Sequence, residues 1–256
     1  TCNRPITIEV SAGANIDVDV GYVECLGRGD VNISVQSGDI TPRINVHSIY
    51  GGAITLNAPG NTVTVGDGFT SDYGVTGNSL SIANAYSAHI GFIHVADYAD
   101  ISAQYGISIS GDTYATNGYV QFINQFADSS NNGIQVGLVH SGGDTTLHTG
   151  SGRMLVNGDI TSDSGYVTLT TMDGEISNSN ATTTSAGEYG VTIHAGGAES
   201  GQIALSNSQI NSDHGYVSLA AEFNNVIDQA SGIEIYGAMA YGDFDAYAQH
   251  AVFALG

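Results

Sequence analysis

Apolar and polar residues alternate in short runs along most of the chain, and the clearest run occurs twice with a nearly identical sequence. Ile160-Thr-Ser-Asp-Ser-Gly-Tyr-Val-Thr-Leu169 returns fifty positions later as Ile210-Asn-Ser-Asp-His-Gly-Tyr-Val-Ser-Leu219. A related run, Tyr189-Gly-Val-Thr-Ile193, lies about halfway between, so equivalent valines fall at positions 167, 191 and 217. Such alternation, bounded by Gly, Asn, Asp and Ser, is typical of half-buried β-strands.

A unit of about 25 residues with short strands and no helical pattern cannot bury its apolar face alone. Stacking each unit on the next solves this, so the repeat predicts an all-β, single-stranded β-solenoid with coils of about 22–26 residues. The valines at 167, 191 and 217 should then form one inward column. Short strands also suit a β-sandwich, which is the alternative fold, but a duplication of coil size favours the solenoid.

Shorter alternating runs extend the pattern through the rest of the chain. Runs begin at positions 80, 93, 107 and 120, which is an almost even spacing, and we interpret two such steps as one coil. Gly-Tyr-Val recurs at positions 21, 118, 165 and 215, at near multiples of the same period. The repeat therefore covers most of the chain.

We expect one domain over residues 1–256, because no part of the sequence looks like a linker: the chain has only three prolines and no block of like charges. Residues 1–28 should form an N-terminal cap and first coil, and residues 29–235 the stacked coils. After Ile235 the repeat loses its register, so residues 236–256 should be a C-terminal cap or a docking segment. Docking onto a neighbour would give a filament, with five aromatic candidates for the contact: Tyr236, Tyr241, Phe244, Tyr247 and Phe253.

The repeats at residues 158–219 resemble those of filamentous-haemagglutinin-like adhesins, in which an Ile precedes a small-residue turn ending in Gly and then Val-x-Leu. A looser resemblance reaches back to about residue 29. It implies a right-handed parallel β-helix and a role as a secreted bacterial surface adhesin. The chain departs from the family in lacking an Asn-Pro-rich N-terminal secretion motif and in being shorter than most such adhesins.

Charge and hydropathy narrow the choice of partners. The chain has no Lys and four Arg against 25 acidic residues, for a net charge of −21. Phosphate backbones and anionic membrane surfaces repel such a chain, and no run approaches the ~18 consecutive apolar residues of a membrane helix. We therefore expect no nucleic-acid partner and no membrane insertion, and we interpret the acidic surface chiefly as an aid to solubility.

The two cysteines, Cys2 and Cys25, are separated in the sequence by about one coil. Equivalent positions of successive coils lie ~4.8 Å from each other, a separation that a disulfide bond tolerates. We predict that the two cysteines form a disulfide bond in an oxidising compartment, so the protein is extracellular or at the cell surface. A start at Thr1 fits a mature secreted product or a fragment. The alternative is two free thiols in a cytosolic protein.

Catalytic and metal-binding signals are weak. The carboxylate pairs Asp17/Asp19, Asp97/Asp100 and Asp243/Asp245 could suit glycoside hydrolysis, but none comes with the nucleophile, base or cation that its chemistry requires. The eight histidines include no zinc spacing, and residues 67–72 offer at most weak calcium binding. We predict no catalytic residue, no cofactor and no metal site.

The expected function is therefore that of a non-enzymatic structural or adhesive β-solenoid, either a module of an adhesin or the protomer of an extracellular fibre. Its partners would be other copies of itself, or a host or surface glycan or protein. The alternative is a carbohydrate-active enzyme, a neutral-glycan hydrolase on the same scaffold. Asn32 and Asn180 fit the glycosylation acceptor pattern.

Overall fold

Strands β1 to β30 stack into one continuous parallel solenoid in a computed structural model of the chain. The structure describes residues 6–10, 18–20, 23–25, 29–35, 39–42, 46–48, 52–65, 74–197, 201–222, 233–240, 242–248 and 253–255. Each pairing between named strands joins one coil to the next, and all of these pairings are parallel. The predicted parallel β-helix is confirmed, and the alternative of an antiparallel sandwich is wrong.

One side of the solenoid, face A, is an 11-stranded sheet to which every coil contributes one strand. Residues at alternate positions of these strands point inward and are buried, as the sequence alternation predicts. The strands are β1 (Ile6–Val10), β4 (Val31–Val35), β7 (Ala53–Asn57), β10 (Ser79–Ala85), β13 (Ala99–Tyr105), β16 (Val120–Phe126), β19 (Thr145–Thr149), β22 (Tyr166–Thr171), β25 (Gly190–Ala195), β27 (Tyr216–Ala221) and β29 (Phe244–Ala248).

The second side, face B, follows face A in each coil and consists mostly of shorter strands. They are β2 (Val18–Val20), β5 (Ile40–Pro42), β8 (Val63–Val65), β11 (Ala88–Ile90), β14 (Ile107–Ile109), β17 (Asn132–Val136), β20 (Arg153–Val156), β23 (Glu175–Asn178), the first parts of β26 (Gln202–Ser212) and β28 (Ile233–Ala240), and β30 (Phe253–Leu255).

The third side, face C, completes each coil and leads back to face A. Its strands are β3 (Val23–Cys25), β6 (Val46–Ser48), β9 (Gly74–Gly77), β12 (Phe92–Val95), β15 (Thr113–Ala115), β18 (Val139–Ser141), β21 (Ile160–Ser162), β24 (Thr183–Ala186) and the second parts of β26 and β28. Because β26 and β28 run through the corner without a break, faces B and C form one 19-stranded sheet.

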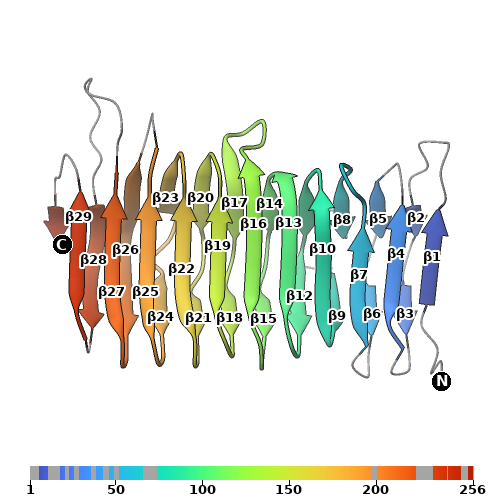
Figure 1. The fold of residues 1–256 in the computed structure, drawn as a ribbon, viewed down its shortest axis with the longest axis horizontal. Helices are drawn as coiled ribbons and strands as arrows, with labels where there is room; N and C mark the ends of the chain where they lie inside the picture. Colours follow the sequence, from blue (N-terminus) through green and yellow to red (C-terminus); the bar gives the residue numbers. More distant parts are fainter. Residues whose placement is uncertain are drawn as a thin grey trace.

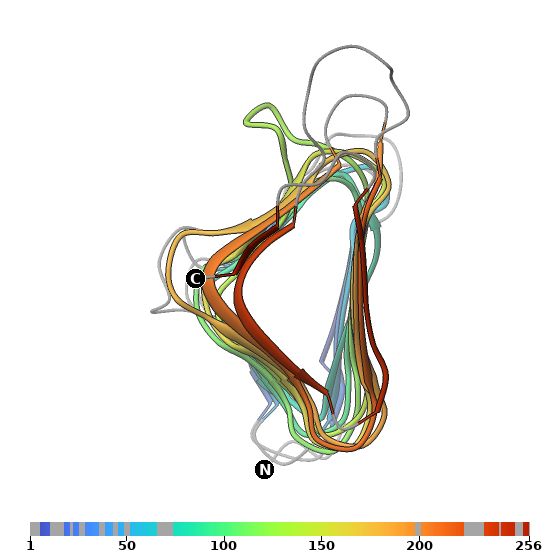
Figure 2. The same ribbon diagram turned by 90° about the vertical axis from the view of Figure 1, so that its left-hand side faces the viewer.

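Seen along its axis, the solenoid has a roughly triangular cross-section (Figure 2). In Figure 1 the nearer strands, those of face A, point upward, the strands behind them point downward, and successive coils advance from right to left. This combination defines a right-handed helix.

The core is a set of inward columns that run the length of the solenoid. Val167 pairs with Val191 and Val191 with Val217, and all three side chains are 0% exposed, so the predicted column is confirmed. Burial of these ladders keeps each coil in register with the next, because a slip of one residue would turn the column outward.

Coil composition differs from the expectation in two ways. Most coils have three strands, not two, and among the complete coils that the structure describes only those that contain β26 and β28 have two. The coil length also varies: the shortest step on face A is from Leu80 to Ala99, and the longest is from Val217 to Phe244. Runs at 80, 93, 107 and 120 therefore belong to faces A, C, B and A, and two steps do not make one coil. The prediction fails because two strands, β13 and β15, have Ala99 and Thr113 at their first inward positions, where the recognised runs have Val, Ile or Leu.

The recurring Gly-Tyr-Val motif marks the corner where face C leads into face A. At Gly215 a Cβ atom would overlap the backbone carbonyl oxygen of Tyr189, and at Gly118 it would overlap that of Asp97. Successive coils thus approach each other so closely at this corner that only glycine fits. The copy at residue 21 is not equivalent, because Val23 lies on face C and pairs with Val46.

The described residues of the C-terminal segment extend the stack. β28 continues through Ala240, and β29 pairs with β27 in the face A register, with Phe244 beside Val217. The pairing of β26 with β28 does shift register between Ile235 and Gly237, as the sequence indicated, but the coils continue to stack beyond this point. No helix among the described residues is long and apolar enough to cross a membrane.

Candidate functional site

A hollow of about 340 Å³ lies on face B, at the corner that joins face A to face B. It forms because a short coil, from Ala99 to Val120, is followed by a longer one, from Val120 to Thr145. The shorter coil turns the corner with Gly106 alone, whereas the longer one carries a projecting loop, residues 127–131 (Figure 1). The hollow is lined by His89, Gly106, Ile107, Ser108, Ser110, Asp128, Ser130, Asn132 and Gln135.

Three polar side chains form a row along the hollow. His89, Ser108 and Gln135 pair in register on consecutive coils, in the middle of β11, β14 and β17. Their strand neighbours on both sides are buried, so these three point outward. Within the described part of the chain, none of the three side chains forms a hydrogen bond. An imidazole, a hydroxyl and an amide therefore face the hollow with their hydrogen-bonding groups available.

The projecting loop is held in one conformation by Asp128. Its carboxylate Oδ1 accepts hydrogen bonds from the backbone N–H groups of Ser130 (2.8 Å) and Asn132 (2.9 Å). Asn131 adopts a positive φ of 63°, and its carbonyl accepts a bond from the backbone N–H of Arg153 (2.8 Å). Asn and Asp tolerate such turn geometry well. The carboxylate therefore stands at the rim of the hollow in a fixed position.

A buried asparagine supports the floor. Asn124 is 1% exposed, and its Oδ1 accepts a bond from the backbone N–H of Gly106 (2.7 Å). Its Nδ2 donates to the carbonyl of Phe126 (2.7 Å) and to Oγ1 of Thr149 (3.1 Å). One side chain thus joins three consecutive coils beneath the hollow, and a buried, fully paired amide of this kind makes the local structure rigid.

Electrostatics leave the hollow with one negative charge. Burial lowers the pKa of His89 below its usual value, although the Asp128 carboxylate opposes this by favouring the imidazolium. The imidazole is therefore neutral at pH 7, and Asp128 is the one ionised side chain among the lining residues.

A second hollow, of about 320 Å³, lies on the other side of the same loop. Ser130 lines both hollows, so the two flank the loop. The lining of the first hollow comes from three successive coils, and we call this hollow the groove. The guanidinium of Arg153 donates to Oδ1 of Asn132 from Nε (3.2 Å) and from the terminal amine (3.0 Å). Asp173 and Glu175 also line this hollow, and outweigh the single positive charge.

Aromatic side chains gather at the two corners of the solenoid where face A meets face B and face C. At the corner with face B, Tyr105 contacts Tyr86 and Phe126, with ring centroids 4.8 and 5.5 Å apart. At the corner with face C, Tyr98 stacks on Tyr119, and Tyr166 stacks on Tyr189. Tyr216 is tilted relative to Tyr166, with ring centroids 6.5 Å apart.

These tyrosines form exposed columns, because Tyr119, Tyr166, Tyr189 and Tyr216 are each between 38% and 48% exposed. Burial and the nearby carboxylates of Asp100 and Asp97 raise the pKa of Tyr119. The flank therefore offers aromatic faces to a partner.

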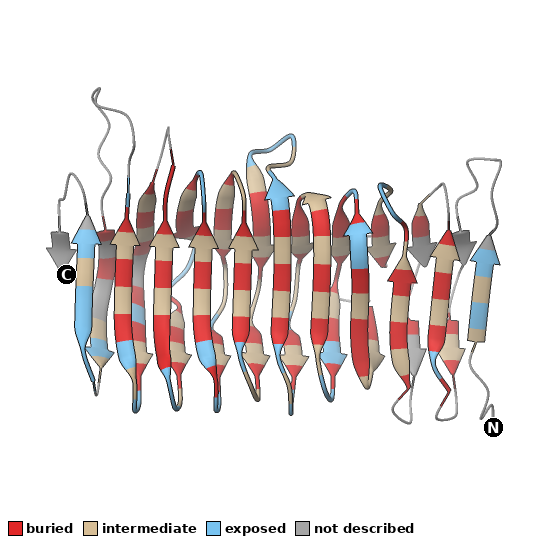
Figure 3. Ribbon diagram, viewed as in Figure 1, coloured by how far each residue is buried: buried red, intermediate tan, exposed pale blue. Residues whose placement is uncertain are grey.

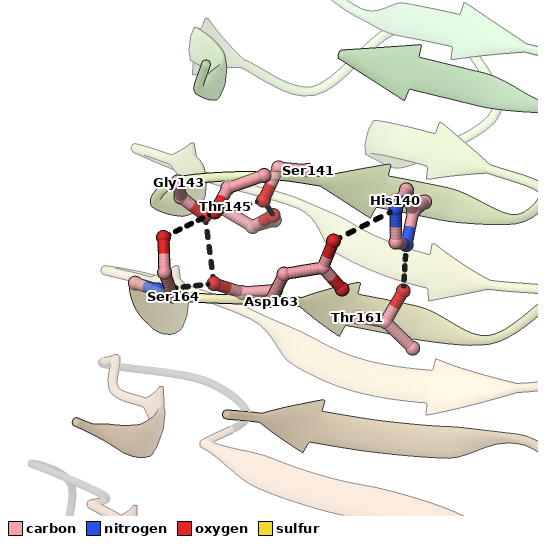
Figure 4. Close-up of polar contacts among 10 residues, drawn as sticks. His140, Ser141, Gly143, Thr145, Thr161, Asp163 and Ser164 are labelled. Atoms are coloured by element: carbon pink, nitrogen blue, oxygen red, sulfur yellow. Dashed lines mark hydrogen bonds and ion pairs between the residues drawn. The ribbon is translucent and has the colours of Figure 1, made fainter. Parts of the chain in front are cut away.

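Face C carries a polar network around His140 (Figure 4). Its Nδ1 lies 2.8 Å from Oγ1 of Thr161, and its Nε2 lies 3.4 Å from Oδ2 of Asp163. A hydroxyl, an imidazole base and a carboxylate are the residue types that nucleophilic catalysis combines. However, the Asp163 side chain is 62% exposed and neither hollow includes these residues, so the network belongs to an open strand surface.

The C-terminal end of face A exposes a core position. Phe244 occupies the column of Val217 and Val191, yet it is 51% exposed because no described residue covers it. Tyr247, on the outward side of the same strand, is 53% exposed. Of the other predicted assembly residues, Tyr236 lies in β28 and Phe253 in β30, while Tyr241 lies outside the described residues.

Other predicted residues are spread over the surface. Cys25 is fully buried at the end of β3, but Cys2 lies outside the described residues, so the disulfide bond stays a prediction. Asp243 and Asp245 are exposed at the C-terminal end, and Asp97 and Asp100 lie beside Tyr119, so neither pair lines the groove.

Of the remaining sites, Asp19 lies in β2, and Asp17 and residues 67–72 lie outside the described residues. Asn32 is half-buried on β4 and Asn180 is exposed, and their glycosylation is not tested. Among the described residues, no three His, Cys, Asp or Glu side chains gather as a metal site would require.

Comparison with protein-family models, curated proteins and solved structures gave no match. The fold and the surfaces define the class as a right-handed parallel β-helix with a groove at one corner. The resemblance of residues 158–219 to surface adhesins stays a prediction.

Proposed function

We propose that this chain is a non-enzymatic structural or adhesive β-solenoid of the cell surface or extracellular space, whose copies stack end to end in a filament. The observation that carries the proposal is Phe244, an inward-column residue that is 51% exposed on the terminal strand of face A. Burying an uncovered core residue against another apolar surface lowers the free energy of the system.

The two ends of the described solenoid fit each other. In this part of the chain β1 and β29 are the edge strands of face A, and both have unpaired backbone groups on their outer side. Ile6 and Ile8 of β1 are partly buried against the core, as the first members of the inward columns. A second copy placed head to tail would continue the parallel ladder and cover Phe244 with these isoleucines. Contacts of this kind do not close on themselves, so they give filaments.

Charge sets the condition for assembly. Each copy carries a net charge of −21, so stacking brings like charges together and is opposed at low ionic strength. The Debye length falls from ~30 Å at 0.01 M salt to ~8 Å at 0.15 M. Filaments should therefore form as salt is added, and disperse again on dilution into low salt.

The proposal of an extracellular or surface location is supported by the adhesin-like repeats and by the spacing of Cys2 and Cys25. The exposed tyrosine columns would supply adhesive surface along the filament's side, since tyrosine combines an apolar ring with a hydroxyl.

The test is sedimentation velocity with electron microscopy at several salt concentrations, on the unmodified chain, Phe244→Asp and Tyr247→Asp. Phe244 and Tyr247 lie on the same terminal strand but on opposite faces. The proposal predicts filaments for the unmodified chain and for Tyr247→Asp, and monomers for Phe244→Asp. A chain that stays monomeric at high salt, or filaments that survive Phe244→Asp, would overturn it.

A further inference from the structure

The groove beside the 127–131 loop has the chemistry of a binding site for an uncharged polyhydroxylated ligand. We propose that this groove binds a neutral oligosaccharide, with Ser108, Gln135 and Asp128 as its hydrogen-bonding groups. The inference is independent of filament formation, because the groove lies on the side of the solenoid and Phe244 at its end.

The groups available match the needs of sugar hydroxyls. Ser108 can donate and accept, the Gln135 amide offers two donors and an acceptor, and a neutral imidazole at His89 offers one of each. The Oδ1 atom of Asp128 is engaged by two backbone N–H groups, and its Oδ2 atom accepts no described hydrogen bond. Hydroxyls both donate and accept, so they can pair with all of these groups, whereas a ligand made only of acceptors would leave Oδ2 of Asp128 without a donor.

Charge excludes acidic sugars. The first hollow holds one carboxylate, and the second holds Asp173 and Glu175 against Arg153, whose guanidinium is already bonded to Asn132. Proteins usually recognise a uronate or a sulfate through Arg guanidinium groups that are free to bind it. The net charge of −21 also repels an acidic ligand. A neutral glycan meets neither obstacle.

The groove is already in its binding shape. Asp128 fixes the loop, Asn124 fixes the floor at Gly106, and the row of His89, Ser108 and Gln135 lies on paired strands. Little conformational entropy is then lost on binding, which raises affinity for a given set of contacts.

Apolar surface lies at the same corner. Tyr105 directly precedes Gly106, and Phe126, 50% exposed, lies two residues before Asp128. Aromatic rings provide an apolar face on which the C–H side of a sugar ring can pack. The groove is lined by residues of three successive coils, so it suits an oligosaccharide better than a single sugar.

The experiment is titration calorimetry of the full chain at low salt with uncharged hexasaccharides of glucose, mannose, galactose and xylose, and with hexagalacturonate as the acidic comparison. We expect at least one neutral hexasaccharide to bind and hexagalacturonate not to bind. Ser108→Ala and Gln135→Ala should each weaken the affinity about tenfold, the value of one or two lost hydrogen bonds.

Thr64→Ala is the matched control, because Thr64 belongs to the same outward row, one coil before His89, and does not line the groove. It should bind as the unmodified chain does, and Phe244→Asp should bind equally well. Absence of binding by all four neutral sugars, equal binding of hexagalacturonate, or affinity unchanged in Gln135→Ala and Ser108→Ala would each overturn the proposal.

Discussion

The centre and the C-terminal end of face A share one column but not one environment. Val191 is packed between Val167 and Val217 and is 0% exposed, whereas Phe244, one coil beyond Val217, is 51% exposed. Figure 3 shows the same contrast, with buried positions in the central strands of face A and exposed ones in β1 and β29. Val191 and Phe244 hold the same position in the repeat, and their exposure differs because a further coil covers Val191 but not Phe244.

This contrast shows that each coil of the solenoid is stabilised by its two neighbours. A residue in the middle is buried from both sides, and its counterpart at an end is buried from one side. Stability should therefore be highest in the centre, and the ends should carry the capacity for association. Three substitutions test this difference, from the largest expected effect to the smallest.

Val191→Asp should have the largest effect, because it places a carboxylate without a partner in the dry centre of the column. Such burial costs several kcal/mol, enough to unfold the neighbouring coils. Thr192→Asp, at the next position, is the control: Thr192 points outward, with Oγ1 3.3 Å from the hydroxyl of Tyr216. Thermal unfolding followed by circular dichroism should show a large fall in Tm for Val191→Asp and a small one for Thr192→Asp. Equal losses would show that the register is wrong.

Gly215→Ala should have an intermediate effect. A Cβ at this position would overlap the carbonyl of Tyr189 in the preceding coil, so the two coils would have to move apart. Overpacking of this kind costs about 1–3 kcal/mol. Gly143→Ala is the control, because its Cβ would lie 3.4 Å from the carbonyl oxygen of Gly118, an ordinary contact. Urea unfolding should give a lower midpoint for Gly215→Ala than for Gly143→Ala. Equal midpoints would mean that the coils can separate at this corner without cost.

The inward columns can be predicted from sequence because their chemistry is local. Val, Ile and Leu at alternate positions indicate a strand and its buried side whatever lies around them. The two near-identical copies, at residues 160–169 and 210–219, indicate the period, and the structure confirms both the column and the parallel stacking.

Some core positions carry no such signal. Thr145 lies fully buried in the inward column, and its Oγ1 is 2.8 Å from Oγ of Ser141. A threonine there resembles a surface residue in the sequence, because its burial depends on a hydroxyl partner from the preceding strand. Strands β13 and β15 escape prediction because Ala99 and Thr113, buried at their first inward positions, are small or polar and do not indicate a buried side in the sequence.

The groove could not be predicted from residue patterns, because it arises from a mismatch between the lengths of two successive coils. One signal is present: the turn-forming cluster Asp128-Ser-Ser-Asn-Asn132 is longer than the single Gly106 at the corresponding corner. Alignment of successive coils by their true register shows it as an insertion. The described carboxylate pairs chosen by spacing lie elsewhere, because residue spacing does not report a hollow.

The smallest effect on stability is expected for Phe244→Asp. It places an aspartate at the end of the inward column, whereas Val217→Asp places one inside the same column. Low ionic strength opposes association of the like-charged chains. Phe244 is 51% exposed and packs on one side only, against the preceding coil, so an aspartate there should lower the free energy of unfolding by about 1 kcal/mol, half the burial free energy of a Phe side chain. Val217→Asp, one coil inward, should cost several kcal/mol because Val217 is 0% exposed. The measurement is urea unfolding of both variants at low ionic strength. A loss for Phe244→Asp as large as that for Val217→Asp would show that the position is covered in the single chain, and a covered position leaves no apolar end for a second copy to bury.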